Sequence, residues 1–134
     1  MDVGGWVVGM IIGVGIDLAE VGRIRDVMLR RGDRFMARVY SQAEREYCLG
    51  KADPASHFAA RFAAKEAFAK AVGTGVAGGM RFSDIEVVRD AAGRPTLELS
   101  GHARELAASM AVGTIHLSLT HTRHTAGAVV VLEG

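Results

Sequence analysis

Apolar positions in the first half of the chain recur at the spacing of a helix. A helix is predicted over about residues 19–31, with charged positions opposite an apolar stripe, and Gly32 ends it. A short helical turn is predicted over residues 34–39. The stripe consists of Leu18, Val21, Ile24, Val27 and Met28. Ser41 and Glu44 have the spacing of a capping box, which predicts a short helix that runs to about Leu49. Residues 57–72 form the longest predicted helix because Ala, Phe, Lys and Glu dominate them.

Strand patterns dominate the second half. Residues 83–89 and 94–99 are predicted to pair as a hairpin, and a helix over about 101–111 follows. Residues 114–121 then alternate between apolar and polar side chains, and an apolar run over 127–132 comes next. We expect these last two strands to form an antiparallel pair.

A further strand is predicted near the start of the chain. Residues 9–16 are apolar and β-branched, which indicates a buried strand that stops at Asp17. Helices cluster in the first half and strands in the second, and this order favours an α+β fold over regular βαβ units. At 134 residues, the chain has the length of a single domain.

The composition narrows the classes of function. With 16 Lys and Arg against 15 Asp and Glu, the net charge of +1 excludes a broadly basic nucleic-acid-binding surface. The single cysteine, Cys48, excludes an internal disulfide and fits a reducing, cytoplasmic compartment. As a helix, the apolar run 3–16 would span about 21 Å, short of the roughly 30 Å of a bilayer core. We therefore expect neither nucleic acid nor membrane as a partner.

Asp17 is the first residue with candidate chemistry. An acid at the end of a strand can present its carboxylate beside the sheet, or it can cap the helix that follows. The glycines before it do not make a dinucleotide-binding fingerprint, because Leu18 stands where the third glycine would be needed.

The longest predicted helix carries a second group of charged residues. Glu66 and Lys70 are four positions apart, which suits a surface ion pair. Arg61, Lys65 and Lys70 also place three cations within a few turns of a glycine-rich loop at 73–79. Glutamate can bind a hard divalent cation while such cations contact phosphate, so a phosphate site is the alternative interpretation.

Two further features permit more than one interpretation. Backbone amides of the loop 73–79 can approach a phosphate, although the same glycines can simply end the helix. It is not a P-loop, because Gly79-Met80 replaces Lys-Ser/Thr. His121, at a strand end, suits a general base, a phosphate contact, a metal ligand or a structural role.

Taken together, four segments resemble one family, the holo-[acyl-carrier-protein] synthases, which are small 4′-phosphopantetheinyl transferases. The segments are Ile12-Gly-Val-Gly-Ile-Asp17, Arg61-Phe-Ala-Ala-Lys-Glu-Ala-Phe-Ala-Lys70, Gly73-Thr-Gly75 and His116-Leu-Ser-Leu-Thr-His121. Their order and spacing also match, and the resemblance runs from about Met10 to the C-terminus. Residues 10–134 are thus the expected transferase domain. Residues 1–9 precede it, so either Met10 is the initiator or 1–9 form an unstructured extension.

The resemblance implies an α+β fold with an antiparallel sheet and a long central helix, assembled as a homotrimer with active sites between subunits. It implies transfer of the 4′-phosphopantetheine arm of coenzyme A to a serine of apo-acyl carrier protein, which releases adenosine 3′,5′-bisphosphate. Asp17 and Glu66 would hold Mg²⁺ and Lys70 would contact the pyrophosphate, and these three are the expected catalytic residues. Glu66 is also the candidate proton acceptor.

The remaining site residues are expected at the substrates. His121 would lie at the coenzyme A site, with Arg61, Lys65, Gly73 and Gly75 as further contacts to its phosphates. Arg23 and Arg30, on the first helix, would dock the acidic carrier protein. Some relatives carry an acid after this histidine, where this chain has Thr122, so we expect two protein carboxylates at the metal.

Two other classes of function remain open from the sequence. A non-catalytic, Mg²⁺-dependent module that binds a nucleotide or coenzyme A would share the same metal and phosphate contacts. A purely structural interaction protein would give Asp17, Glu66 and Lys70 no reason to converge. Whether the carrier serves fatty-acid, polyketide or peptide synthesis is also open.

Overall fold

The computed structural model describes residues 2–3, 6–7, 9–73 and 79–134. Its strands and helices are β1 (Asp2–Val3), β2 (Trp6–Val7), β3 (Ile11–Glu20), α1 (Val21–Val39), α2 (Gln42–Leu49), α3 (Pro54–Ala71), η2 (Phe82–Asp84), β4 (Ile85–Arg89), β5 (Pro95–Leu99), α4 (Gly101–Ser109), β6 (Thr114–His121) and β7 (Thr125–Glu133). Among these described residues, no helix is long and apolar enough to cross a bilayer.

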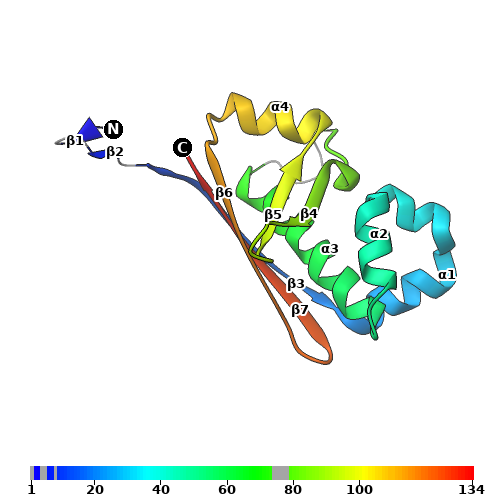
Figure 1. Ribbon diagram of the computed structural model, residues 1–134. Coiled ribbons are helices and arrows are strands. Elements are labelled where there is room, and N and C mark those ends of the chain that lie inside the picture. The colour runs from blue at the N-terminus through cyan, green and yellow to red at the C-terminus, as the bar shows by residue number, and fades with distance from the viewer. Residues whose placement is uncertain (1, 4–5, 8, 74–78) are drawn as a thin grey trace.

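The central unit is an antiparallel sheet with the strand order β3-β7-β6, and α3 packs across one of its faces (Figure 1). The hairpin β4–β5 pairs separately, with β4 against α3 and β5 beside β6, while α1 and α2 pack near the beginning of α3. The short strands β1 and β2 pair with each other. The predicted α+β fold with a long central helix is confirmed.

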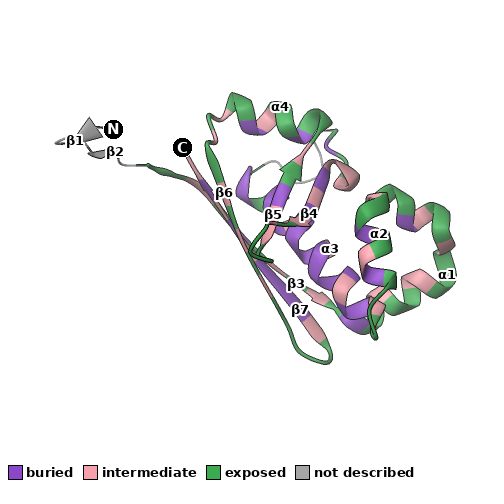
Figure 2. Cartoon of the chain, in the orientation of Figure 1, coloured by how far each residue is buried: buried purple, intermediate pink, exposed green. Residues whose placement is uncertain are grey.

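Helix α3 is buried almost all around, as Figure 2 shows. Seven alanines, at positions 55, 59, 60, 63, 64, 67 and 69, are at most 4% exposed, and Phe58 and Phe68 are at most 1% exposed. A helix that is apolar on every side requires neighbours on every side, and the sheet, the hairpin and α1 supply them. This central position brings the charged residues of α3 into contact with several elements.

The prediction of a buried first strand that stops at Asp17 is wrong in two respects. Strand β3 continues through Asp17 to Glu20, and its large side chains point outward, with Val14, Ile16 and Leu18 exposed by 58, 65 and 69%. The inward positions are Gly13 and Gly15, where a Cβ would lie 2.0 and 1.9 Å from carbonyl oxygens of α3. Helix and strand approach so closely that only glycine fits between them.

Most predicted local features of the remaining elements are confirmed. Ser41 and Glu44 form the predicted capping box at the start of α2. Gly32 interrupts α1 with a φ of 72°, and the predicted second helical stretch follows it and ends at Val39. Ser100 stands at the N-cap of α4 without capping it, because its hydroxyl donates to Asp84 instead.

Candidate active site

Asp17 and Lys70 meet between β3 and the last turn of α3. Strand alternation puts Asp17 on the same inward face as Gly13 and Gly15, where its side chain is 16% exposed. The Lys70 ammonium donates to Asp17 Oδ1 at 2.7 Å and to the carbonyl of Ile16 at 3.1 Å. The Asp17 hydrogen bond raises the pKa of Lys70, so the lysine remains charged.

Glu66 lies one turn before Lys70 and lines the same groove as Asp17. Partial burial and the negative charge of Asp17 raise the pKa of Glu66, and Lys70 opposes this effect. Neither of the simpler interpretations of these residues holds. Among the described residues, the ion pair of Lys70 is with Asp17 rather than Glu66, and α1 begins after Glu20 without a side-chain cap.

The groove that contains the two carboxylates runs along the first turns of α1. Beyond Asp17 and Glu66, its walls consist of Leu18, Ala19, Glu20, Arg23, Ile24, Val27 and Phe62. Two carboxylates without a cation between them repel each other, and their oxygens are ligands that a hard divalent cation prefers. The donor set therefore fits Mg²⁺. Among the described residues no third His, Cys, Asp or Glu completes a cluster, so water and substrate oxygens would supply the other ligands.

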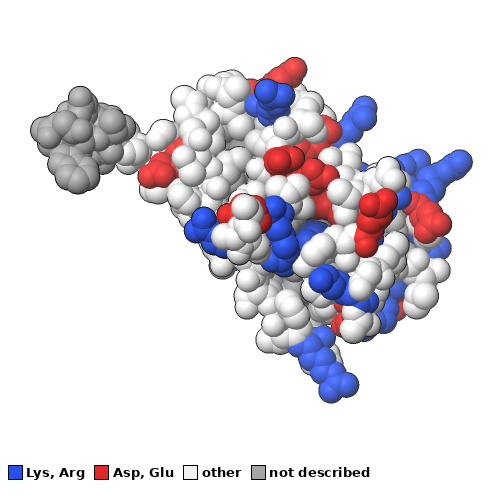
Figure 3. All heavy atoms as spheres, viewed as in Figure 1, with Lys and Arg blue, Asp and Glu red and all other residues white. Residues whose placement is uncertain are grey.

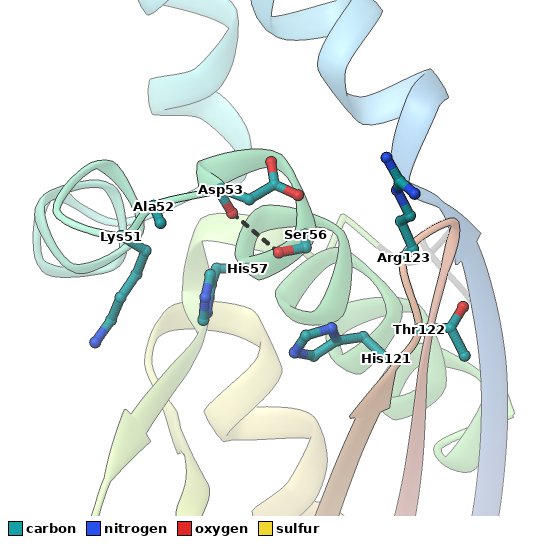
Figure 4. Close-up of a pocket in the computed structure, with 8 residues that line it drawn as sticks. All are labelled: Lys51, Ala52, Asp53, Ser56, His57, His121, Thr122 and Arg123. Carbon is teal, nitrogen blue, oxygen red and sulfur yellow. Dashed lines mark hydrogen bonds between the residues drawn. The ribbon is translucent and has the colours of Figure 1, made fainter.

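His121 lies in a second hollow, at the end of β6, which we call the histidine pocket (Figure 4). The pocket has a volume of about 610 Å³, and its other lining residues are Lys51, Ala52, Asp53, Ser56, His57, Thr122 and Arg123. The rings of His57 and His121 lie 5.9 Å apart. Burial, together with nearby positive charges led by Arg61, lowers the pKa of His57. An electropositive pocket of this kind suits an anion.

Sequence reasoning missed Lys51, His57 and Arg123 as pocket residues. No motif links them, because they come from the loop after α2, from the first turn of α3 and from the β6–β7 turn. Only the packing of α3 against the end of β6 joins them to His121. The histidine at position 57, inside an otherwise alanine-rich helix, was the one available signal.

The predicted phosphate contact of Lys65 needs correction. Lys65 is completely buried, and its ammonium donates to Glu44 Oε1 at 2.8 Å, to the Phe82 carbonyl at 3.0 Å and to the Ile85 carbonyl. An ammonium has three N–H donors, so none is left for a substrate. Lys65 therefore joins α3 to α2 and to the β4 region.

The other predicted contacts lie in different surroundings. Arg61 is only 2% exposed and stacks on the ring of Tyr47, beside the histidine pocket rather than the carboxylate groove. Gly73 ends α3 with a φ of 83° and is exposed, which suits a helix terminus. Gly75 lies outside the described residues. Arg23 and Arg30 are both exposed on α1, and Arg23 lines the carboxylate groove.

Comparison with known proteins decides the family. The family model of the 4′-phosphopantetheinyl transferase superfamily matches residues 13–129. The chain belongs to this superfamily. The holo-[acyl-carrier-protein] synthase of Syntrophus aciditrophicus is 47% identical over 125 residues, which cover 93% of this chain and 98% of that protein.

Solved structures of other phosphopantetheinyl transferases support the same family assignment. The holo-[acyl-carrier-protein] synthase of Neisseria meningitidis superimposes with a TM-score of 0.85 at 34% identity, covering 93% of this chain and 100% of that one. The Bacillus anthracis enzyme, solved in complex with coenzyme A (3′,5′-ADP), has a TM-score of 0.76 at 39% identity, covering 93% and 98%. The predicted family, fold and transferase activity are confirmed.

Proposed function

We propose that this phosphopantetheinyl transferase acts at the carboxylate groove, with Asp17 and Glu66 as ligands of one Mg²⁺. The reaction moves the 4′-phosphopantetheine arm of coenzyme A to a serine of an apo-acyl carrier protein. One observation carries the assignment: two carboxylates from β3 and α3, distant in sequence, line one groove next to the Lys70 ammonium. Nothing in helix capping or in an α3 surface ion pair requires that convergence.

Each residue of the groove has a separate role in this proposal. The bound ion would neutralise charge on the pyrophosphate that reacts. Lys70 uses two of its three N–H donors on Asp17 and the Ile16 carbonyl, which orients Asp17 and leaves a third donor for a phosphate oxygen. Glu66 would accept the proton of the carrier serine, directly or through water.

The structures of the two substrates determine which bond forms and which bond breaks. The serine oxygen attacks the phosphorus that carries the pantetheine arm, and the bridging oxygen of the pyrophosphate leaves with adenosine 3′,5′-bisphosphate. Such transfers require charge neutralisation more than covalent help from the protein. The nucleophile comes from the partner, which is consistent with the absence of a Gly-x-Ser-x-Gly motif from the sequence.

The histidine pocket is the proposed site for another anionic part of coenzyme A. The cations Lys51 and Arg123 and the rings of His57 and His121 line one pocket, and cations are suited to phosphate. Among its lining residues the only acid is Asp53, which already pairs with Arg25 at 3.0 Å. The position of His121 in this pocket supports the prediction that it contacts coenzyme A.

A homotrimer with shared active sites is part of the proposal. Asp17 belongs to β3 and His121 to β6, which are the two outer strands of the sheet, with β7 between them. In a ring of copies, the β3 edge of one subunit would lie beside the β6 edge of the next. The carboxylate groove of one subunit and the histidine pocket of its neighbour could then contact one coenzyme A. The exposed row of Val14, Ile16 and Leu18 also supports burial against another copy.

Carrier docking is proposed on α1. Figure 3 shows Lys and Arg side chains over this helix, with acidic side chains between them. Arg23 and Arg30 are exposed, and Arg23 lies on the wall of the carboxylate groove. An acidic carrier bound there would present its serine close to Asp17 and Glu66.

The test uses Asp17→Asn and Glu66→Gln, which retain shape while each removes one negative charge. Mass spectrometry follows the carrier, which gains about 340 Da when it receives the arm. We expect each variant to lose about 10²–10³ in kcat and to require more Mg²⁺. The double variant should lose much less than the product of the single losses, because the ion is already lost.

A matched control is Asp90→Asn, which removes the carboxylate of another exposed ion pair, with Arg94 at 3.2 Å. Its Mg²⁺ response should equal that of the wild type. A wild-type Mg²⁺ titration curve in Glu66→Gln would contradict the site. Mg²⁺-dependent binding of coenzyme A by the wild type, without any mass gain on the carrier, would instead support the non-catalytic module.

A further inference from the structure

Three cations surround one aromatic ring beside the histidine pocket. The guanidinium carbon of Arg61 lies 4.3 Å from the centre of the Tyr47 ring, Lys51 Nζ lies at 4.5 Å and the guanidinium carbon of Arg89 at 5.3 Å. Arg89 Nε also donates to the Tyr47 hydroxyl at 2.9 Å. These residues come from α2, the loop after it, α3 and β4, so only the tertiary structure collects them.

Arg61 is the unusual member of this cluster because its charge is buried without a carboxylate. The residue is 2% exposed, its Nε has no hydrogen-bond partner, and its Nη1 reaches only the His57 carbonyl, at 3.5 Å. Within the described part of the chain, no acid lies within ion-pair distance of Arg61, Lys51 or Arg89. A buried charge without a partner is costly, so an anion from outside the chain would relieve the cost.

The ring can hold the cations without cancelling their charge. An aromatic face attracts a cation through its quadrupole, whereas a carboxylate in the same place would neutralise it. The ring therefore offsets part of the repulsion among the three like charges and leaves their positive potential for a ligand. The Tyr47 ring also meets the His57 ring edge-on at 6.0 Å, so the cluster adjoins the histidine pocket, which Lys51 also lines.

We propose that Tyr47 is a positioning residue that holds Arg61, Lys51 and Arg89 together as a binding site for phosphate groups of coenzyme A. The inference rests on the proposed function, because it assigns the anion of the histidine pocket to that substrate. Tyr47 itself makes no contact with the reacting atoms. Its removal acts on binding of coenzyme A and leaves the chemical step unchanged.

The first experiment compares Tyr47→Phe with Tyr47→Leu. Phenylalanine keeps the ring and loses only the hydroxyl contact with Arg89, so the Kd for coenzyme A should stay within about 2-fold of wild type. Leucine removes the ring, and the Kd should rise about 5- to 30-fold. KM for coenzyme A should rise in parallel while kcat and the KM for the carrier stay near wild type.

Tyr47 also packs against a core cluster, so Tyr47→Leu can fail to fold. A second series keeps the shape: phenylalanine at position 47 is replaced by mono-, tri- and pentafluorophenylalanine, which progressively weaken the ring's attraction for cations. The Kd for coenzyme A should increase stepwise along the series, while pantetheine, which lacks phosphate, should show no trend.

A matched control is Phe35→Leu, because Arg31 lies 4.7 Å from that ring at another surface. Its Kd for coenzyme A should be unchanged. The proposed function is tested independently with the wild type, by measuring coenzyme A binding and the mass gain of the carrier. An unchanged or tighter Kd in folded Tyr47→Leu, or no trend in the fluorinated series, would overturn the role of Tyr47 and leave the proposed function intact.

Discussion

Replacing Lys65 by methionine tests directly whether this residue belongs to the core or to the substrate site. The structure predicts a large loss of stability, because Lys65 and Glu44 are both completely buried at their side chains and lie 2.8 Å apart. Methionine fills a similar volume but donates no hydrogen bond. Glu44 would then keep its contacts with the Ser41 and Val87 amides, but its charge would lose its partner.

The expected magnitude follows from these contacts. Removing one partner of a buried ion pair costs about 3–5 kcal/mol, because the other charge stays buried and uncompensated. The Phe82 and Ile85 carbonyls lose the same donor. A 134-residue domain has a total stability of roughly 7–20 kcal/mol, so the loss is a large fraction of the whole. At this size it corresponds to a decrease in Tm of roughly 10–20 °C.

Urea and thermal unfolding of three variants measure the effect. Lys65→Met and Glu44→Gln should each be strongly destabilised, while the double variant should lose about 1–3 kcal/mol less than the sum. The control is Arg25→Met, which breaks an exposed ion pair with Asp53 and should cost at most about 1 kcal/mol. At a temperature where Lys65→Met remains folded, its KM for coenzyme A should stay within about 2-fold of wild type.

The opposite pattern would refute this reasoning. If Lys65→Met kept the wild-type Tm and showed a much higher KM for coenzyme A, the ammonium would contact phosphate, as the sequence pattern alone suggested. Destabilisation by an amount no larger than that of Arg25→Met would also contradict the buried ion pair.

Two further predictions concern the partners of the chain. Ile16→Asp, on the outer face of the sheet, should give a folded monomer in sedimentation velocity and no activity in the carrier assay, because Ile16 is 65% exposed in the single subunit and such apolar surface is usually covered. Leu49→Asp, at a similarly exposed apolar position of α2 (62%), should behave like the wild type. An active Ile16→Asp monomer would contradict the trimer. Arg23→Glu should raise the KM for carrier protein and make that KM less dependent on salt, because exposed charges mainly affect association. Arg104→Glu on α4 should change neither quantity. Equal KM values for carrier in the two variants would exclude docking at α1.

The sequence by itself determined most of the local structure and the family. The capping box of Ser41 and Glu44, the alternation along β6 and the helix composition of α3 depend only on neighbours in the chain, so their patterns predicted the elements. The motifs around Asp17 and Glu66 likewise indicated the transferase, because their residue types and order are specific even without coordinates.

Tertiary structure decided which residues meet. Strand alternation cannot say which face of β3 is inward, and the close approach of α3 selected Gly13 and Gly15 over the larger apolar residues. Lys65 has the sequence context of a surface lysine. Because other elements surround α3, its ammonium is buried and pairs with Glu44. Lys70 bonds Asp17 rather than Glu66 because β3 runs beside the last turn of α3. Periodicity reports the spacing of side chains along one element, whereas partners depend on distances between elements that are far apart in the chain.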